Sequence, residues 1–111
     1  MLTRKTAIKL INDFISACAE RNITFQKVIL FGSVASGRTH QYSDIDVAFV
    51  SDQFTGNPFY DLKSLNPIKI ADHKFLDIEP LTFTPKEFES GDDTFLEEVV
   101  KKTGIEIPLN N

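Results

Sequence analysis

Residues 30–49 read LFGSVASGRTHQYSDIDVAF, and this stretch holds the most informative pattern in the chain. Its first half continues a short apolar run, residues 27–31, that stops at Gly32, which is the pattern of a buried strand. The residues that follow, 33–43, are mostly small or polar and indicate a loop or one helical turn. A second run rich in β-branched and aromatic residues then begins at 45–50. We therefore expect two strands joined by a short connection.

The segments before and after this stretch add helices. A helix is predicted over residues 3–21, because apolar side chains recur there at spacings of three and four, with Thr3 as the N-cap. Two short helical pieces are predicted over residues 59–65 and 67–73. They are divided at Pro67, because proline disfavours helical backbone in the residue before it.

The last third of the chain adds one more strand and two helices. Residues 74–83 read as a third strand. Thr84 and Glu87 form a capping box, so a helix begins there, and a last helix is predicted over residues 93–104. The resulting order, α-β-(short α)-β-α-β-α, predicts an α/β (α+β) fold, with a small mixed sheet flanked by helices.

Composition narrows the class of protein. The chain has 111 residues, of which 41% are hydrophobic and 25% charged, and its net charge is -4. These values predict one domain over residues 1–111 with an ordinary core. No apolar run approaches the ~20 residues of a membrane-spanning helix, and no signal-peptide core is evident. A single cysteine, Cys18, fits the cytoplasm, and the acidic balance argues against nucleic acid as a partner.

The corner after the first strand is suited to anions. Gly32 permits close approach of a ligand to the backbone, and Ser33 offers a hydroxyl beside the free N–H groups of a helix start. Phosphate is the anion that such corners favour most. No lysine follows in the place that a P-loop requires, so that interpretation fails.

Two acidic residues introduce the second strand. Asp44 and Asp46 lie two positions apart, so their side chains project from one face, while Ile45 and Val47 project from the other. Two unpaired carboxylates at this distance repel each other, and a divalent cation removes the conflict. Mg²⁺ prefers such oxygen ligands, completed by water and substrate phosphate. Either motif alone is common in turns and strand edges, so the prediction depends on their combination.

That combination resembles a known signature. Gly32 and Ser33, then ten residues, then Asp44-x-Asp46 resemble the motif of the DNA polymerase β-like nucleotidyltransferase superfamily, and the flanking residues resemble its minimal nucleotidyltransferases. The resemblance implies an αβαβαβα core. It also implies transfer of a nucleoside monophosphate, AMP from ATP, to an acceptor hydroxyl, with release of pyrophosphate.

The nucleotide-binding residues implied by the resemblance are Gly32, Ser33, Arg38 and Ser43. One position departs from the pattern: Val34 stands where many relatives carry arginine or another polar residue. Arg38 is the residue expected to replace that phosphate contact.

The resemblance also implies a third carboxylate on a later strand. Asp77 and Glu79 are the candidates, and period-two alternation places both on one face of the third strand. Glu79 is preferred because it lies a few residues before the helix start at Thr84, with Pro80 indicating an edge strand. Asp77 remains the alternative. Asp44, Asp46 and the third acid are expected to bind two Mg²⁺ ions, and the third acid to accept the acceptor's proton.

Two kinds of partner follow from the same resemblance. Minimal nucleotidyltransferases resemble the antitoxin half of modules whose other half is an all-helical HEPN-domain toxin, so binding or adenylylation of such a protein is the alternative function. A self-dimer is the other possibility, because a chain this short supplies few walls for a substrate. His40 and His73 are expected at the surface, and Cys18 and most phenylalanines in the core.

Overall fold

The N-terminal helix shows how the chain builds its core. The computed structural model describes residues 2–38 and 44–109. Helix α1 (Arg4–Ala19) begins at a capping box, in which the Thr3 hydroxyl accepts from the Thr6 N–H at 3.1 Å. Its fully buried side chains recur at every third or fourth position: Ala7, Ile11, Phe14 and Cys18. The predicted apolar stripe had Ile8 and Ile15 in place of Ala7, and these two are only partly buried. The fully buried side chains hold α1 along one face of the sheet.

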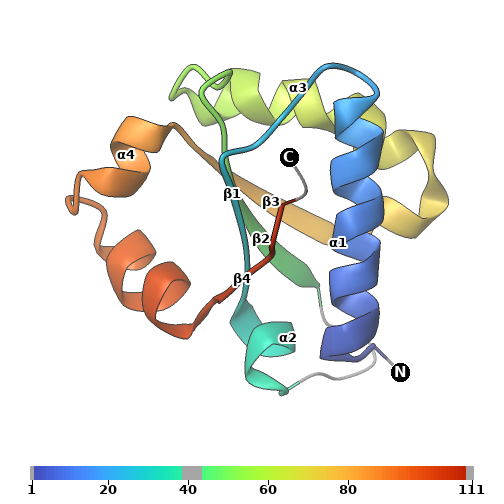
Figure 1. The fold of residues 1–111 in the computed structure, drawn as a ribbon, viewed down its shortest axis with the longest axis horizontal. Coiled ribbons are helices and arrows are strands. Elements are labelled where there is room, and N and C mark those ends of the chain that lie inside the picture. Colours follow the sequence, from blue (N-terminus) through green and yellow to red (C-terminus); the bar gives the residue numbers. More distant parts are fainter. Residues whose placement is uncertain (1, 39–43, 110–111) are drawn as a thin grey trace.

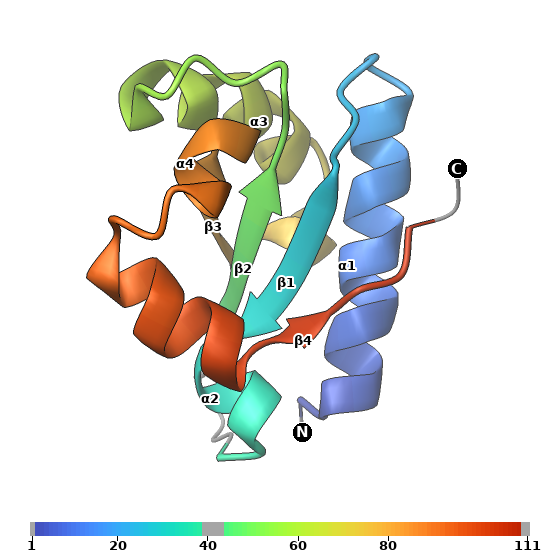
Figure 2. The same cartoon turned by 60° about the vertical axis from the view of Figure 1, so that its left-hand side comes forward.

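The sheet has four strands in the order β3-β2-β1-β4 (Figures 1 and 2). Its strands are β1 (Lys27–Phe31), β2 (Ile45–Val50), β3 (Ile78–Phe83) and β4 (Ile105–Glu106). β1 runs antiparallel to β2 and β4, whereas β2 runs parallel to β3. The predicted mixed sheet flanked by helices is thus confirmed.

Five helical segments connect or follow these strands. They are α2 (Gly32–Ser36), α3 (Pro58–Ala71), the 3₁₀ turn η1 (His73–Phe75), α4 (Pro85–Glu89) and the π-helical segment η2 (Leu96–Lys101). In Figure 1 the sheet is seen nearly edge-on, with α1 on one side and α4 and η2 on the other. No helix within the described ranges is long and apolar enough to cross a membrane.

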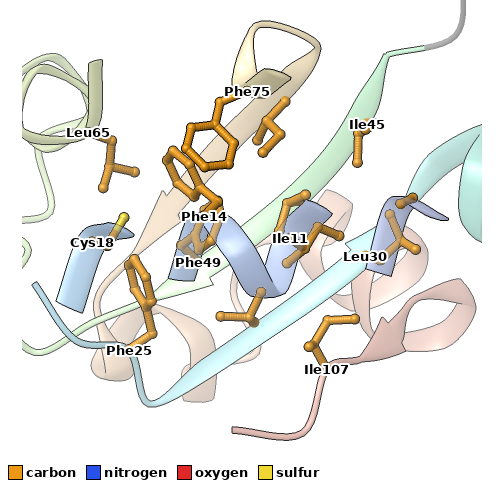
Figure 3. Packing of buried hydrophobic residues seen from close by; sticks show 14 of the residues in the cluster. Ile11, Phe14, Cys18, Phe25, Leu30, Ile45, Phe49, Leu65, Phe75 and Ile107 are labelled. Carbon is orange, nitrogen blue, oxygen red and sulfur yellow. The ribbon is translucent and has the colours of Figure 1, made fainter. Parts of the chain in front are cut away.

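The two faces of the sheet bury separate apolar clusters. The larger cluster lies under α1 and α3, where Phe14 packs on Phe49 and Phe75 with ring centroids 5.6 and 5.1 Å apart (Figure 3). The smaller cluster lies under α4 and η2, and its sheet residues include Ala48 and Val50. Phenylalanines and Cys18 were expected in the core, and the first cluster confirms this for Cys18, which is fully buried.

The structure differs from the predictions at α3 and at the start of β3, and it contains one strand that was not predicted. One helix, α3, replaces the two expected pieces and runs through Pro67, because Leu65 and Ile68 are buried on either side and hold both halves on the sheet. The third strand begins at Ile78 rather than at residue 74, because residues 73–75 form a 3₁₀ turn. β4 was not predicted.

Candidate active site

Three carboxylates come together at one end of the sheet. In the parallel pairing of β2 and β3, Asp46 lies directly opposite Glu79, and Asp44 immediately precedes β2. All three line a hollow of about 520 Å³. The remaining lining residues are apolar: Phe31, Pro80, Leu81 and Phe95. The structure therefore places the predicted acids Asp44, Asp46 and Glu79 in a single site.

The hollow exists because the smaller apolar cluster stops short of the carboxylates. Asp46, Ala48 and Val50 point to the same face of β2, since side chains alternate along a strand. Ala48 and Val50 are covered by α4 and η2 and are at most 2% exposed. Asp46 is only half-buried, and Asp44 and Glu79 are exposed. This end of the face is thus open to a ligand.

Gly32 brings the turn after β1 against the Asp46 carboxylate. Phe31, the last residue of β1, pairs with Asp46 on β2, so the chain turns into α2 directly beside that carboxylate. Gly32 has a φ of 77°, and a side chain there would collide with the Asp46 carboxylate. Only glycine fits this position on both counts. The two halves of the predicted motif are therefore in contact.

The corner itself is a short helix without a side-chain cap. Phe31 is the N-cap of α2, and its side chain makes no capping hydrogen bond to the first N–H groups of the helix. Ser33 follows, half-buried. Gly37 ends the helix in the left-handed region, with a φ of 78°.

Electrostatic conflict is strongest at Asp46. Burial of this carboxyl, followed by the negative charges of Asp44 and Glu79, raises the pKa of Asp46 above its ordinary value of 3.8. A raised pKa means that the ionised form is disfavoured where it stands. A cation placed among the three carboxylates would relieve both causes.

The donor set fits magnesium in its chemistry. Three carboxylates supply the hard oxygen ligands that Mg²⁺ prefers, with room for water and phosphate in the open hollow. Within residues 2–38 and 44–109, however, no three His, Cys, Asp or Glu side chains are gathered closely enough to hold a metal ion as they stand. Binding an ion therefore requires these side chains to draw together.

Other predicted residues lie around or outside the hollow. Asp77 precedes β3 and does not line the hollow; its backbone carbonyl accepts from the Ile45 N–H at 2.9 Å. Arg38 is exposed, and its backbone N–H donates to the Ser33 carbonyl at 2.9 Å. Val34 is fully buried in the larger cluster, which explains an apolar residue at this position. Ser43 lies outside the described residues, as does His40.

The apolar part of the hollow was not predicted from the sequence. Phe31 was predicted as a core residue and is buried, but it also forms the floor of the hollow. Phe95, immediately before η2, packs edge-on against Phe31 with ring centroids 5.9 Å apart. Only the packing of the final helix over β1 brings Phe95 here, so no local sequence signal reports it.

The family model of the nucleotidyltransferase domain matches residues 11–107. A search of curated proteins found no significant match.

Solved structures also resemble the chain. One is a provisionally assigned nucleotidyltransferase from Sulfolobus solfataricus, with 18% identity, a TM-score of 0.64, and coverage of 93% of this chain and 80% of that one. Another is a toxin–antitoxin with AMP-PNP, with 24% identity, a TM-score of 0.54, and coverage of 99% and 76%. A mutant of the toxin–antitoxin MntA–HpeT has 22% identity, a TM-score of 0.52 and the same coverage. At these identities the likeness establishes the fold.

Proposed function

The chain belongs to the nucleotidyltransferase domain family, and from that premise we propose that it transfers AMP from ATP to an acceptor hydroxyl and releases pyrophosphate. The observation that carries the proposal is the meeting of Asp44, Asp46 and Glu79 in one open hollow beside Gly32. One structural neighbour is a toxin–antitoxin crystal structure with the ATP analogue AMP-PNP, which supports ATP as the donor.

The proposed reaction is a single displacement at the α-phosphorus. The acceptor oxygen forms a bond to that phosphorus, the bond from the phosphorus to the bridging oxygen breaks, and pyrophosphate leaves with the electron pair. Gly32 and Ser33 hold the β- and γ-phosphates through backbone N–H groups and the hydroxyl. Glu79 receives the proton of the acceptor hydroxyl. Orientation of the two reactants supplies much of the rate.

Asp44, Asp46 and Glu79 are the residues proposed to hold Mg²⁺, two ions in the complete site. When bound, the ions neutralise the charge of the triphosphate and of the transition state. The raised pKa of Asp46 supports this assignment, because a cation stabilises the ionised carboxylate that burial and the neighbouring carboxylates disfavour.

The central test is loss of the carboxylates. The variants Asp44→Asn and Asp46→Asn should each lower magnesium-dependent pyrophosphate release, and transfer of label from α-phosphate-labelled ATP, by about 100-fold or more. Asp52→Asn is the matched control, because Asp52 is an exposed aspartate two positions beyond β2. Transfer that survives at the wild-type rate in both Asn variants would contradict the proposal.

A second pair of variants assigns the third carboxylate. Glu79→Gln should lower transfer as strongly as the loss of Asp46, whereas Asp77→Asn should leave it nearly unchanged. Support for this expectation comes from the position of Glu79 opposite Asp46, while Asp77 lies outside the hollow. The opposite result would assign the role to Asp77.

The second candidate function is that of an antitoxin-like partner of a helical HEPN-domain protein. Two structural neighbours are toxin–antitoxin structures, which supports this alternative. Helix α3 also carries three exposed apolar side chains, Phe59, Tyr60 and Ile70, which are 67, 59 and 71% exposed. Exposed apolar surface of this kind suits a protein partner.

Co-expression with the product of the neighbouring reading frame tests this candidate. A small helical protein carrying an Arg-x4-6-His motif should co-purify with the chain at fixed stoichiometry. A chain that elutes alone, as monomer or self-dimer, in the presence of that protein would count against the alternative and favour a stand-alone transferase.

A further inference from the structure

Phe95 is an aromatic side chain exposed at the rim of the candidate active site. Six large apolar side chains among the described residues have substantial exposure: Phe59, Tyr60, Ile70, Leu76, Leu81 and Phe95. Of these six, only Leu81 and Phe95 line the carboxylate hollow. Phe95 is 48% exposed. An exposed aromatic ring in a hollow that also holds three carboxylates calls for a ligand with both a charged and a flat apolar part.

The ring is held in place rather than free to move. Its edge-on contact with Phe31 has an interplanar angle of 78°. Phe31 itself is 5% exposed, and the residue after Phe95, Leu96, is fully buried in the smaller cluster. The contact with Phe31 and the buried chain neighbour Leu96 anchor Phe95 to the core, while about half of its surface stays exposed. A ring anchored in this way is a platform that costs a ligand little conformational entropy to use.

Phe95 lies on the same side of the hollow as the proposed phosphate contacts. Phe95 packs on Phe31, which is the last residue of β1 and directly precedes Gly32 and Ser33. The proposed phosphate contacts thus directly follow the strand residue against which the platform packs. Glu79 and Leu81 belong to β3, on the other side of β2. That side is left for the acceptor.

We propose that the nucleobase of the substrate stacks on the exposed face of Phe95, an inference that rests on the proposed transfer from a nucleoside triphosphate. Stacking is tolerant of base identity, because every base presents a flat π-face. The chain accordingly recognises the triphosphate and the flat face of the base, and it discriminates little between ATP and GTP.

A fluorescence titration tests the contact without reference to transfer. The sequence contains no tryptophan, so Phe95→Trp creates a protein with one indole, placed at the platform. With Mg²⁺ present, ATP and GTP should each change its emission saturably, whereas inorganic tripolyphosphate, which has the phosphates but no base, should not. Phe59→Trp is the matched control, since Phe59 is exposed on α3 and does not line the hollow. Its emission should respond to none of the three compounds.

Steady-state kinetics give the second test. Phe95→Ala should raise the KM for ATP about tenfold and leave kcat nearly unchanged, as expected for loss of one base–aromatic contact. Phe59→Ala should change neither constant. A structural role alone would lower kcat or stability together with any rise in KM, so the split between the two constants separates the explanations.

The outcomes separate this inference from the proposed transfer. If ATP leaves the indole at position 95 unchanged, or if tripolyphosphate changes it equally, the stacking role is overturned, whatever the transfer assay shows. An unchanged KM in Phe95→Ala overturns it as well. If instead the indole responds to ATP while wild-type protein transfers no AMP, the stacking role stands and the proposed transfer fails.

Discussion

Gly32 lies where the backbone after β1 comes closest to the Asp46 carboxylate. Its φ of 77° disfavours any other L-residue, and its hydrogen faces the Asp46 carboxylate. Replacing Gly32 by Ala should therefore cost about 1–2 kcal/mol in the free energy of unfolding through backbone strain, and it should also displace Asp46. We expect transfer to fall much further than the loss of stability explains.

Gly91→Ala is the matched control for that substitution. Gly91 has the same φ of 77°, but nothing lies within 4 Å of the position a side chain would take. Urea unfolding should report a similar loss for both variants, and the transfer assay should report a defect for Gly32→Ala alone. Equal activity in the two variants would refute the role of the Asp46 contact.

Asp46 makes stability depend on pH in a predictable direction. Burial, with the charges of Asp44 and Glu79, raises its pKa above 3.8 in the folded protein. Between the unfolded and folded pKa values the folded state binds more protons, so the free energy of unfolding falls as pH rises through this window. Asp46→Asn removes the cost of the buried charge, and without divalent cations the variant should exceed wild type in stability near neutral pH.

Urea unfolding in the presence of a chelator measures this effect. The advantage of Asp46→Asn should shrink as the pH is lowered toward and below 3.8, where the wild-type carboxyl is protonated in both states. Asp52→Asn, at an exposed position, serves as the control. An Asn variant less stable than wild type at neutral pH would show that the folded state favours the charge.

Residue spacing predicted part of the site and not the rest. Gly32, Asp44 and Asp46 followed from two local motifs on neighbouring strands. The choice between Asp77 and Glu79 stayed open, because alternation counted from residue 74 placed both on one face; Asp77 in fact precedes the strand. Phe95 was beyond prediction, since only tertiary packing brings it to the hollow.

At the scale of elements, α3 contains a proline that the helix tolerates at a cost. Pro67 lies inside α3 and lacks the N–H that would bond to the preceding turn. Pro67→Ala restores this donor at an exposed position. It also raises the conformational entropy of the unfolded chain, which opposes part of the gain in stability. We expect a net rise of about 1–2 kcal/mol in the free energy of unfolding, measured with urea.

Pro58→Ala provides the comparison within the same helix. Pro58 occupies the first turn of α3, where a missing N–H costs nothing and a fixed φ helps. This variant should be slightly less stable than wild type, by about 0.4–1 kcal/mol. If both alanine variants shift stability in the same direction, the helix-interior explanation for Pro67 is wrong.

Element prediction succeeded where one local signal decided the outcome. The apolar runs 27–31 and 45–50 match β1 and β2 residue for residue, and the capping box at Thr84 begins α4. It failed where a tertiary contact outweighed the local signal, as burial of Leu65 and Ile68 did at Pro67. The two residues of β4 carry too little pattern to be read without β1 as their neighbour.

At the scale of the molecule, Cys18 reports on the integrity of the whole core. It is fully buried in the larger cluster, and burial, opposed only in part by Arg21, raises the pKa of its thiol to about 12. Reaction with a thiol reagent requires the exposed thiolate, so modification near neutral pH should be far slower in the folded protein than in denaturant.

The control for Cys18 moves the thiol to the surface of the same helix. In a Cys18→Ala background, Ser16→Cys places it at an exposed position of α1, where reagent should react promptly. The reaction of Cys18 in wild type should instead accelerate with urea in parallel with unfolding. Prompt modification of the folded wild-type protein would contradict the packing of α1.

The order of helices and strands predicted the class of fold, but strand direction decides where the site forms. A long connection containing α3 joins β2 to β3 and lets them run parallel, which sets Asp46 and Glu79 side by side. The remaining neighbours in the sheet are antiparallel. The direction of a strand relative to its neighbour depends on how the connection between them crosses the sheet. The local sequence pattern does not predict that crossing.

The position of Pro80 has a consequence for aggregation. The Asp77 carbonyl accepts from the Ile45 N–H, and the Phe83 carbonyl accepts from the Ser51 N–H, so the backbone groups of the odd-numbered residues in β3 face β2. The backbone of Pro80 therefore faces the open edge of the sheet. An exposed strand edge invites other strands to add to it, and proline withholds the donor they need. The exposed edge of β3, the strand that carries Glu79, therefore resists pairing with strands of other molecules.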